Sequence, residues 1–179
     1  MSGMTRQQFE SILDALCTQL GDEARREIFS TSIQFETRAR QIVNNLLNRS
    51  GYQVDFNPHP QAFPDIAIGP FGIEVKHTTN DTWRSVANSV LETNRIQSVR
   101  HVYLLFGKMG GQPDVRWDVY EKCVMHVRTS HVPRFEVEIG ASVSLFDQMG
   151  ISYDQFRISE MHEKMQYIRQ YARGRLKPG

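Results

Sequence analysis

The stretch that decides the fold runs from Phe63 to Lys76 and reads FPDIAIGPFGIEVK. Two short apolar runs, at residues 65–68 and 73–77, flank the segment GPFG at residues 69–72, which is rich in turn-forming residues. Side chains along a strand alternate between the two faces of a sheet. The stretch is therefore predicted to form a β-hairpin whose two faces differ in chemistry.

The number of residues in the turn decides which side chains share a face. An even turn places Asp65 beside Lys76 and Ala67 beside Glu74, so that the polar groups lie on one face and the β-branched residues on the other. A three-residue turn ending in a bulge at Gly72 is the alternative, and it would separate Asp65 from Glu74. We prefer the even turn because it alone keeps the apolar residues together.

The polar face of this hairpin has the chemistry of a metal-assisted hydrolase. Asp65 and Glu74 are carboxylates, and Mg²⁺ is a hard cation that prefers oxygen ligands and keeps several of its waters. The backbone carbonyl of Val75 is a further candidate ligand. A bound metal acts as a Lewis acid and lowers the pKa of its water, while Lys76 would orient that water or neutralise developing charge. The pattern predicts phosphodiester hydrolysis with Mg²⁺, or with Mn²⁺ as its substitute.

Pro64-Asp65 followed by Glu74-Val75-Lys76 resembles the motif of the PD-(D/E)xK nuclease superfamily. That superfamily includes type II restriction endonucleases, mismatch-repair nickases and archaeal Holliday-junction resolvases. The resemblance implies metal-binding roles for Asp65 and Glu74 and a catalytic role for Lys76. It also implies 5′-phosphate products and, for cutting both strands of duplex DNA, a homodimer.

The order of elements between about residue 33 and residue 107 is also similar to that of the superfamily. A helix at residues 33–48 precedes the hairpin, a helix is expected at residues 83–97, and the apolar run HVYLLF at residues 101–106 is typical of a buried strand. The resemblance implies an accessory metal or water-positioning role for Glu36. Its alternative is a solvated residue beside core Phe35. Residues 108–179 carry no motif of the superfamily.

The remaining elements complete an α/β fold with a central mixed β-sheet and one crossover helix. This restriction-endonuclease-like core has helical extensions at both ends, in a single nuclease domain of residues 1–179. Its expected parts are N-terminal helices at 1–32, a catalytic core at 33–140 and a C-terminal helical extension at 141–179. Thr5 and Gln8 form a capping box at the first helix, Gly21 is expected to end it, and Asp22 to cap a short second helix. Further strands are expected at residues 52–56, 115–120, 122–127 and 135–139, and a last helix at 161–176.

The net charge of +1 conceals basic segments that suit a polyanion. Residues 84–134 carry eight Lys and Arg side chains against four Asp and Glu. The segment 128–134 is the best candidate for recognition, because Arg, Ser and Thr contact phosphates and base edges. The alternative is an ordinary surface loop, and the same holds for the glycine-rich loop at 107–113. The candidate DNA-binding residues are Arg84, Asn88, Lys108, Arg128, Ser130, His131 and Arg134.

Other features of the sequence narrow the class of protein. No apolar run approaches the roughly 20 residues of a membrane helix, and no secretory signal is visible. Cys17 and Cys123 are expected to be buried free thiols in a reducing cytoplasm. The sequence thus predicts a cytoplasmic, Mg²⁺-dependent endonuclease for double-stranded DNA, of sequence-specific type II restriction character. A repair or Holliday-junction-type nuclease is one alternative. The other is a non-catalytic DNA-binding or interaction module, in which the three polar residues form a surface ion-pair ladder.

Overall fold

The computed structural model describes residues 3–49, 51 and 61–176 of the 179-residue chain. The strand expected at residues 52–56 lies outside these residues. The chain forms two units, one from the described parts of Met1–Trp83 and Asn94–Tyr120, the other from Arg84–Thr93 and Glu121–Gly179. The chain therefore passes three times from one unit to the other, and each unit contains segments that are distant in sequence.

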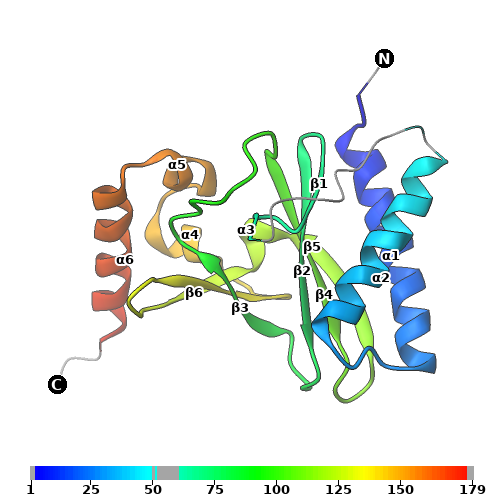
Figure 1. Ribbon diagram of the computed structural model, residues 1–179. Helices are drawn as coiled ribbons and strands as arrows, with labels where there is room; N and C mark the ends of the chain where they lie inside the picture. Colours follow the sequence, from blue (N-terminus) through cyan, green and yellow to red (C-terminus); the bar gives the residue numbers. More distant parts are fainter. Residues whose placement is uncertain (1–2, 50, 52–60, 177–179) are drawn as a thin grey trace. The chain divides into compact units, whose positions relative to one another are not determined.

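The first unit is built on a four-stranded mixed sheet (Figure 1). The predicted hairpin supplies one edge of this sheet, and the predicted apolar strand is the parallel neighbour of its second strand. The last strand pairs antiparallel with that apolar strand. In the order β1-β2-β4-β5 the strands are β1 (Ile66–Ile68), β2 (Phe71–Thr78), β4 (His101–Lys108) and β5 (Asp114–Val119).

Two long helices, α1 (Arg6–Arg26) and α2 (Ser32–Asn48), pack on one face of this sheet, α1 along β5 and α2 along β2. The predicted capping box of Thr5 and Gln8 is present at the start of α1. The predicted helix end at Gly21 is wrong, because α1 continues to Arg26 and Asp22 caps no second helix. Continuation keeps Ala24 on the buried stripe, and that burial outweighs the roughly 1 kcal/mol lower helix propensity of glycine.

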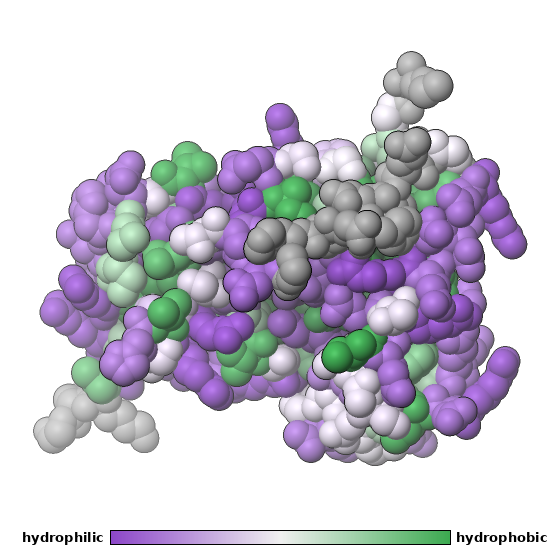
Figure 2. Space-filling view, viewed as in Figure 1, coloured by the Kyte–Doolittle hydropathy of each residue, from purple (hydrophilic) through white to green (hydrophobic). Residues whose placement is uncertain are grey.

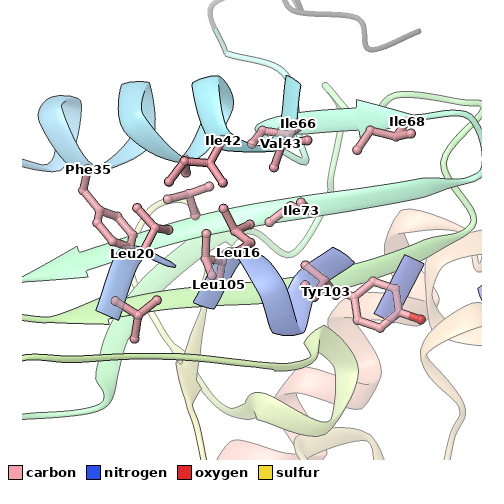
Figure 3. Close-up of a cluster of buried hydrophobic side chains, with 14 of the residues drawn as sticks. Leu16, Leu20, Phe35, Ile42, Val43, Ile66, Ile68, Ile73, Tyr103 and Leu105 are labelled. Carbon is pink, nitrogen blue, oxygen red and sulfur yellow. The ribbon is translucent and has the colours of Figure 1, made fainter. Parts of the chain in front are cut away.

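The core of the first unit lies between these helices and the sheet, as Figure 3 shows. The ring of Phe35 on α2 lies against Gly107 of β4, where a Cβ atom would be 2.6 Å from the Cζ atom of Phe35. His77 points to the same face, with its Nε2 atom 2.7 Å from the carbonyl oxygen of Phe29. Labelled members of this core in Figure 3 are Leu16, Leu20, Phe35, Ile42, Val43, Ile66, Ile68, Ile73, Tyr103 and Leu105.

The connection between the parallel strands β2 and β4 differs from the prediction. The helix expected at residues 83–97 is absent, and its first part forms strand β3 (Arg84–Ser89), which pairs with β7 (Arg134–Glu138). The local sequence RSVANS contains serine, valine and asparagine, which are weak helix formers. Pairing with β7 satisfies the backbone of β3 instead, so the segment joins the sheet of the second unit.

The second unit is an antiparallel sheet in the order β3-β7-β6, followed by short helices. Strand β6 (Val124–Arg128) follows a single helical turn, α3 (Tyr120–Cys123). The strands predicted near residues 122–127 and 135–139 are therefore present, but in this second sheet. An aromatic cluster of Phe135, Phe146 and Phe156 packs this unit. The helices are α4 (Leu145–Met149), α5 (Tyr153–Ile158) and α6 (Met161–Arg175).

The predicted α/β class, with a mixed sheet and helices in the N- and C-terminal segments, is confirmed. None of the described helices is both long and apolar enough to span a membrane. On the face drawn in Figure 2, hydrophobic residues form separate small patches among hydrophilic ones. Scattered apolar residues of this kind are normal on a protein surface.

Candidate active site

The turn of the hairpin has two residues, Gly69-Pro70, because Ile68 at the end of β1 pairs with Phe71 at the start of β2. Ile66 pairs with Ile73 in the same register. These apolar side chains all belong to the core beneath the two long helices. The predicted even turn is confirmed, and with it the prediction that the apolar residues share one face.

The predicted pairing within this hairpin is wrong by two residues. Ala67 pairs with Gly72 rather than with Glu74, and one further step of this register sets Asp65 opposite Glu74 rather than beside Lys76. The strands close to a two-residue turn, the commonest hairpin connection. A shift of two residues leaves each side chain on its original face. Asp65, Glu74 and Lys76 therefore still lie on the face opposite the helices.

The side chains of these three residues converge at the point where β1 begins. The Nζ atom of Lys76 is 3.1 Å from the Oε1 atom of Glu74. The Val75 amide donates a hydrogen bond of 2.8 Å to the Oδ2 atom of Asp65. The N–H and C=O of a strand residue point to the same side, so the Val75 carbonyl also faces the side on which Asp65 lies.

The two carboxyl groups are buried in surroundings that disfavour their charge. Burial, opposed by the Lys76 ammonium and reinforced by Asp65, raises the pKa of Glu74 to about 8. Burial also raises the pKa of Asp65; the Val75 amide opposes this, whereas the nearby Glu36 adds to it. Only 6% of Glu74 is exposed. The site thus holds more acidic than basic groups in a poorly solvated place, which a bound cation would relieve.

Helix α2 adds two side chains to the site. Glu36 accepts a hydrogen bond of 2.7 Å from the Nη2 atom of Arg40, one helical turn later. The same Nη2 atom donates a 2.6 Å hydrogen bond to the backbone carbonyl of Asp65. The predicted accessory residue, Glu36, is therefore placed beside the hairpin. Arg40 was not identified from the sequence, although its i, i+4 spacing from Glu36 was the available signal.

The position of Asp65 also depends on close packing between Pro64 and Gly72. A Cβ atom at Gly72 would lie 2.3 Å from the Cγ atom of Pro64 and 2.8 Å from Cγ1 of Val99. Only glycine lets the proline ring approach β2 this closely. The residue before it, Phe63, is fixed by backbone hydrogen bonds to the segment at residues 94–96. The start of the hairpin is therefore held on both sides of Pro64.

The donor set of this site fits Mg²⁺ better than a metal that needs many side-chain ligands. Across the described residues, no three His, Cys, Asp or Glu side chains are grouped to hold a metal ion. The predicted ligands are two carboxylates, Asp65 and Glu74, and one backbone carbonyl, that of Val75. Mg²⁺ in proteins that act on phosphates is often bound through one or two carboxylates, with waters and phosphate oxygens completing its shell.

One predicted DNA-binding residue, Lys108, lies in the first unit and is buried. Its Nζ atom is 2.7 Å from the Oδ1 atom of Asp81 and donates to the backbone carbonyls of Gly110 and Gln112. The ammonium group has three donors, and these three partners use them. This placement favours an ordinary turn organised by Lys108 over a contact with DNA.

Two of the three predicted arginines of the second unit pair with one buried carboxylate. Arg84 and Arg128 both form ion pairs with Glu136 of β7. The guanidinium of Arg134 donates to the backbone carbonyl of Ala87. Arg128 is 62% exposed even though it is paired. These side chains form a cationic face on the sheet of the second unit.

The other predicted contacts of the second unit have local partners or face solvent. Asn88 donates to the carbonyl of Ser89, and the Ser130 hydroxyl donates to the carbonyl of Val132. His131 is exposed. The predicted catalytic residues thus belong to the first unit, whereas all predicted DNA-binding residues except Lys108 belong to the second.

Comparison with known proteins identified no relative of this chain. The chain matches no protein-family model, and no curated protein sequence matches it. The resemblance to the PD-(D/E)xK superfamily is therefore carried by the residues of the hairpin and by their geometry. One element of that resemblance is not present, since β3 replaces the helix expected after β2.

Proposed function

We propose that this chain is a Mg²⁺-dependent endonuclease that hydrolyses phosphodiester bonds in duplex DNA, of the sequence-specific restriction type. The observation that carries the proposal is the convergence of Asp65, Glu74 and Lys76 on one face of the hairpin. Two acids and one amine, brought together by adjacent strands, are the groups that metal-assisted hydrolysis of a phosphodiester requires.

Each side chain has a defined task in this proposal. Asp65 and Glu74, with the Val75 carbonyl, would hold Mg²⁺, which when bound supplies Lewis acidity and a water of lowered pKa. Lys76, anchored by its ion pair with Glu74, donates to a phosphate oxygen as negative charge develops there. Glu36, partly exposed beside Asp65, orients the attacking water.

The burial of Glu74 distinguishes this proposal from a non-catalytic module. A surface ion-pair ladder would leave Glu74 in solvent, where its pKa would be ordinary. Instead burial raises that pKa to about 8. Burying a carboxyl group beside a second acid destabilises the fold, and such arrangements are concentrated at functional sites. A DNA-binding module would gain nothing from this arrangement.

The proposal includes a partner and a cellular setting. A chain with one such site cuts both strands of a duplex when two copies act together, so we propose a homodimer on DNA. Sedimentation of the chain with and without an oligonucleotide duplex measures this. Within the described part of the chain, Cys17 and Cys123 form no disulfide, which suits the reducing cytoplasm proposed as its location.

Cleavage of plasmid and of long linear DNA with Mg²⁺, Mn²⁺ or EDTA tests the activity. We expect cutting with either metal and none with EDTA. Lys76→Ala should lose at least about 100-fold of the rate, the usual effect of removing one transition-state donor. Lys122→Ala, which removes an exposed lysine on α3, is the matched control and should cut normally.

The products of this assay separate the related possibilities. Fragments of defined length indicate sequence-specific restriction, whereas preference for a four-way junction over linear duplex indicates a junction nuclease. A parent protein that cuts no DNA with either metal, or a Lys76→Ala variant as active as the parent, would show that the proposed function is wrong.

A further inference from the structure

A second group of side chains lies on the same face of the first unit's sheet as Lys76. Lys76 on β2 pairs with Phe106 on β4, and Phe106 pairs with Arg116 on β5. Paired residues of neighbouring strands project from the same face, so these three form one row across the sheet. Because strands lie about 4.8 Å apart, the Cα atoms of Lys76 and Arg116 are about 10 Å apart.

The guanidinium group of Arg116 is held in place from two directions. Its Cζ atom lies 4.4 Å from the centroid of the Trp83 ring, and its Nε atom is 3.1 Å from the Oδ2 atom of Asp114. The Trp83 ring in turn meets Phe106 edge-on, with the centroids 5.7 Å apart. Trp83 therefore lies on the same face of the sheet as Lys76.

These two contacts leave the outer edge of the guanidinium available. The Arg116 side chain is 55% exposed, and within the described part of the chain no hydrogen bond involves its Nη1 or Nη2 atom. A fixed guanidinium with two free Nη groups matches the spacing of two oxygens of a phosphate or carboxylate. It also loses little side-chain entropy when such a ligand binds.

The surroundings of Arg116 contain both cations and carboxylates. Together with Trp83 it lines a pocket of about 740 Å³, to which Arg25 and Lys108 contribute two more cations and Asp81 and Asp114 two carboxylates. Lys108 pairs with Asp81, Arg116 pairs with Asp114, and Arg25 pairs with Asp22 and, at 3.7 Å, with Asp114. An added anion would therefore be bound through the free Nη groups of Arg116 rather than through a net positive charge of the pocket.

We propose that Trp83 and Arg116 form a phosphate-binding site for the backbone of a DNA duplex that lies over Lys76. This inference rests on the proposed function. A separation of about 10 Å keeps the two positions on the same stretch of backbone, so the site would hold a phosphate close to the scissile one. It fixes the position of the duplex and reads no bases.

Stacking of an unpaired base on Trp83 is a poorer explanation. One face of the indole is covered by Arg116, its neighbour Phe106 meets it edge-on, and the Lys108 ammonium lies 5.5 Å from the ring centroid. A base would have to displace these groups, whereas a phosphate adds to them. The ring instead orients the guanidinium through a cation–π contact.

Binding of a random-sequence duplex, measured by fluorescence anisotropy at several NaCl concentrations, tests this site. All proteins carry Lys76→Ala so that binding is measured without cleavage. With Arg116→Gln we expect about tenfold weaker binding at low salt, with the slope of log K against log salt reduced by about one. The effect should be the same for duplexes of different sequence.

Arg6→Gln is the matched control for the lost charge. Arg6 is also 55% exposed, and its Nε atom likewise contacts one carboxylate at 3.1 Å, that of Glu10, in addition to the Tyr103 hydroxyl at 3.1 Å. It lies on α1, which packs on the other face of the sheet. The control should leave both the affinity and the salt slope unchanged. Thermal unfolding of both variants should stay close to that of the parent, because each replaces an exposed side chain.

Trp83→Leu tests whether the tryptophan acts through Arg116. We expect it to weaken binding less than Arg116→Gln does, and the double variant to bind no more weakly than Arg116→Gln alone. Additive losses would contradict this orienting role.

The outcomes for the site and for the proposed function are separate. If the parent cuts DNA but Arg116→Gln binds like Arg6→Gln, the phosphate site is wrong and the nuclease proposal stands. If the parent cuts no DNA but its binding depends on Arg116, the nuclease proposal is wrong and the phosphate site stands. A protein that binds no duplex at all would overturn the site directly.

Discussion

At the scale of single residues, Glu74 occupies a position that folding alone would not select. The carboxyl group is buried, a second acid lies close by, and one ammonium group compensates both. Its pKa is raised from 4.5 to about 8, so the folded protein holds the proton more tightly than the unfolded chain does between these values. The contribution of this group to stability is therefore lost as the pH rises through about 8.

Replacement of the acid by its neutral isostere makes this effect measurable. We expect Glu74→Gln to match the parent near pH 4 and to be more stable by on the order of 2–4 kcal/mol at pH 9, because its amide never ionises. Urea unfolding without divalent metal, at a series of pH values, measures the difference. The same variant should cut no DNA. A stability difference independent of pH would contradict the burial argument.

Gly72 is a residue whose replacement should separate folding from activity. In Gly72→Ala the new methyl group would lie 2.3 Å from the Pro64 ring, so the ring must move and Asp65 beside it must move too. Overpacking of this kind lowers stability by about 1–3 kcal/mol, and we expect cleavage to fall by a larger factor than the unfolded fraction explains. Urea unfolding and plasmid cleavage together measure this. Gly174→Ala on α6, where a Cβ meets open space, should not lower stability, because alanine is the better helix former, and should leave cleavage unchanged.

At the scale of elements, α2 supports the hairpin through Arg40. One Nη2 atom joins the Glu36 carboxylate to the Asp65 carbonyl, so the helix and the start of β1 are held together at the site. Arg40→Ala should lower stability by about 1–3 kcal/mol and lower the cleavage rate by about tenfold.

A second arginine on the same helix supplies the control for this prediction. Arg38 pairs with Glu23 of α1 and has no contact with the hairpin among the described residues. Arg38→Ala should lower stability but leave cleavage by the folded protein unchanged. Equal losses of cleavage in both variants would show that α2 stabilises the unit without positioning the site.

The sequence predicted the elements of the site better than their exact pairing. Alternation of apolar and polar residues sufficed to assign Asp65, Glu74 and Lys76 to one face, because a strand has only two faces. It did not distinguish two registers that differ by two residues, since both keep those faces. The length of the turn decided between them.

Elements that depend on distant partners were predicted less well. Residues 84–89 were predicted from the local sequence to belong to a helix at residues 83–97. Their partner is β7, some 50 residues later in the chain, and no local pattern contains that information. The same reason applies to α1, whose continuation past Gly21 depends on the sheet beneath it.

At the scale of the whole molecule, the two carboxylates should link metal binding to stability. A metal that binds the folded chain but not the unfolded one stabilises it by about 2.7 kcal/mol at a hundred times its dissociation constant. For a chain of this size, that raises Tm by roughly 5–10 °C. We expect MgCl₂ to raise the Tm of the parent in a concentration-dependent way, measured by calorimetry.

Two variants define the site of this effect. Asp65→Asn should abolish the rise in Tm with MgCl₂, whereas Asp154→Asn, at an exposed carboxylate on α5, should preserve it. A rise of equal size in both variants would place the metal elsewhere.

The contact between Phe35 and Gly107 fixes the position of α2, and with it the position of Glu36, relative to the hairpin. The Phe35 ring occupies the space that a side chain at Gly107 of β4 would fill. This packing prevents α2 from sliding along the sheet or rotating on it. A slip of one residue would turn the helix by about 100° and advance it by about 1.5 Å, which would carry Glu36 away from the hairpin. Gly107→Ala would fill this space and would therefore displace Glu36, although position 107 is not in contact with Glu36.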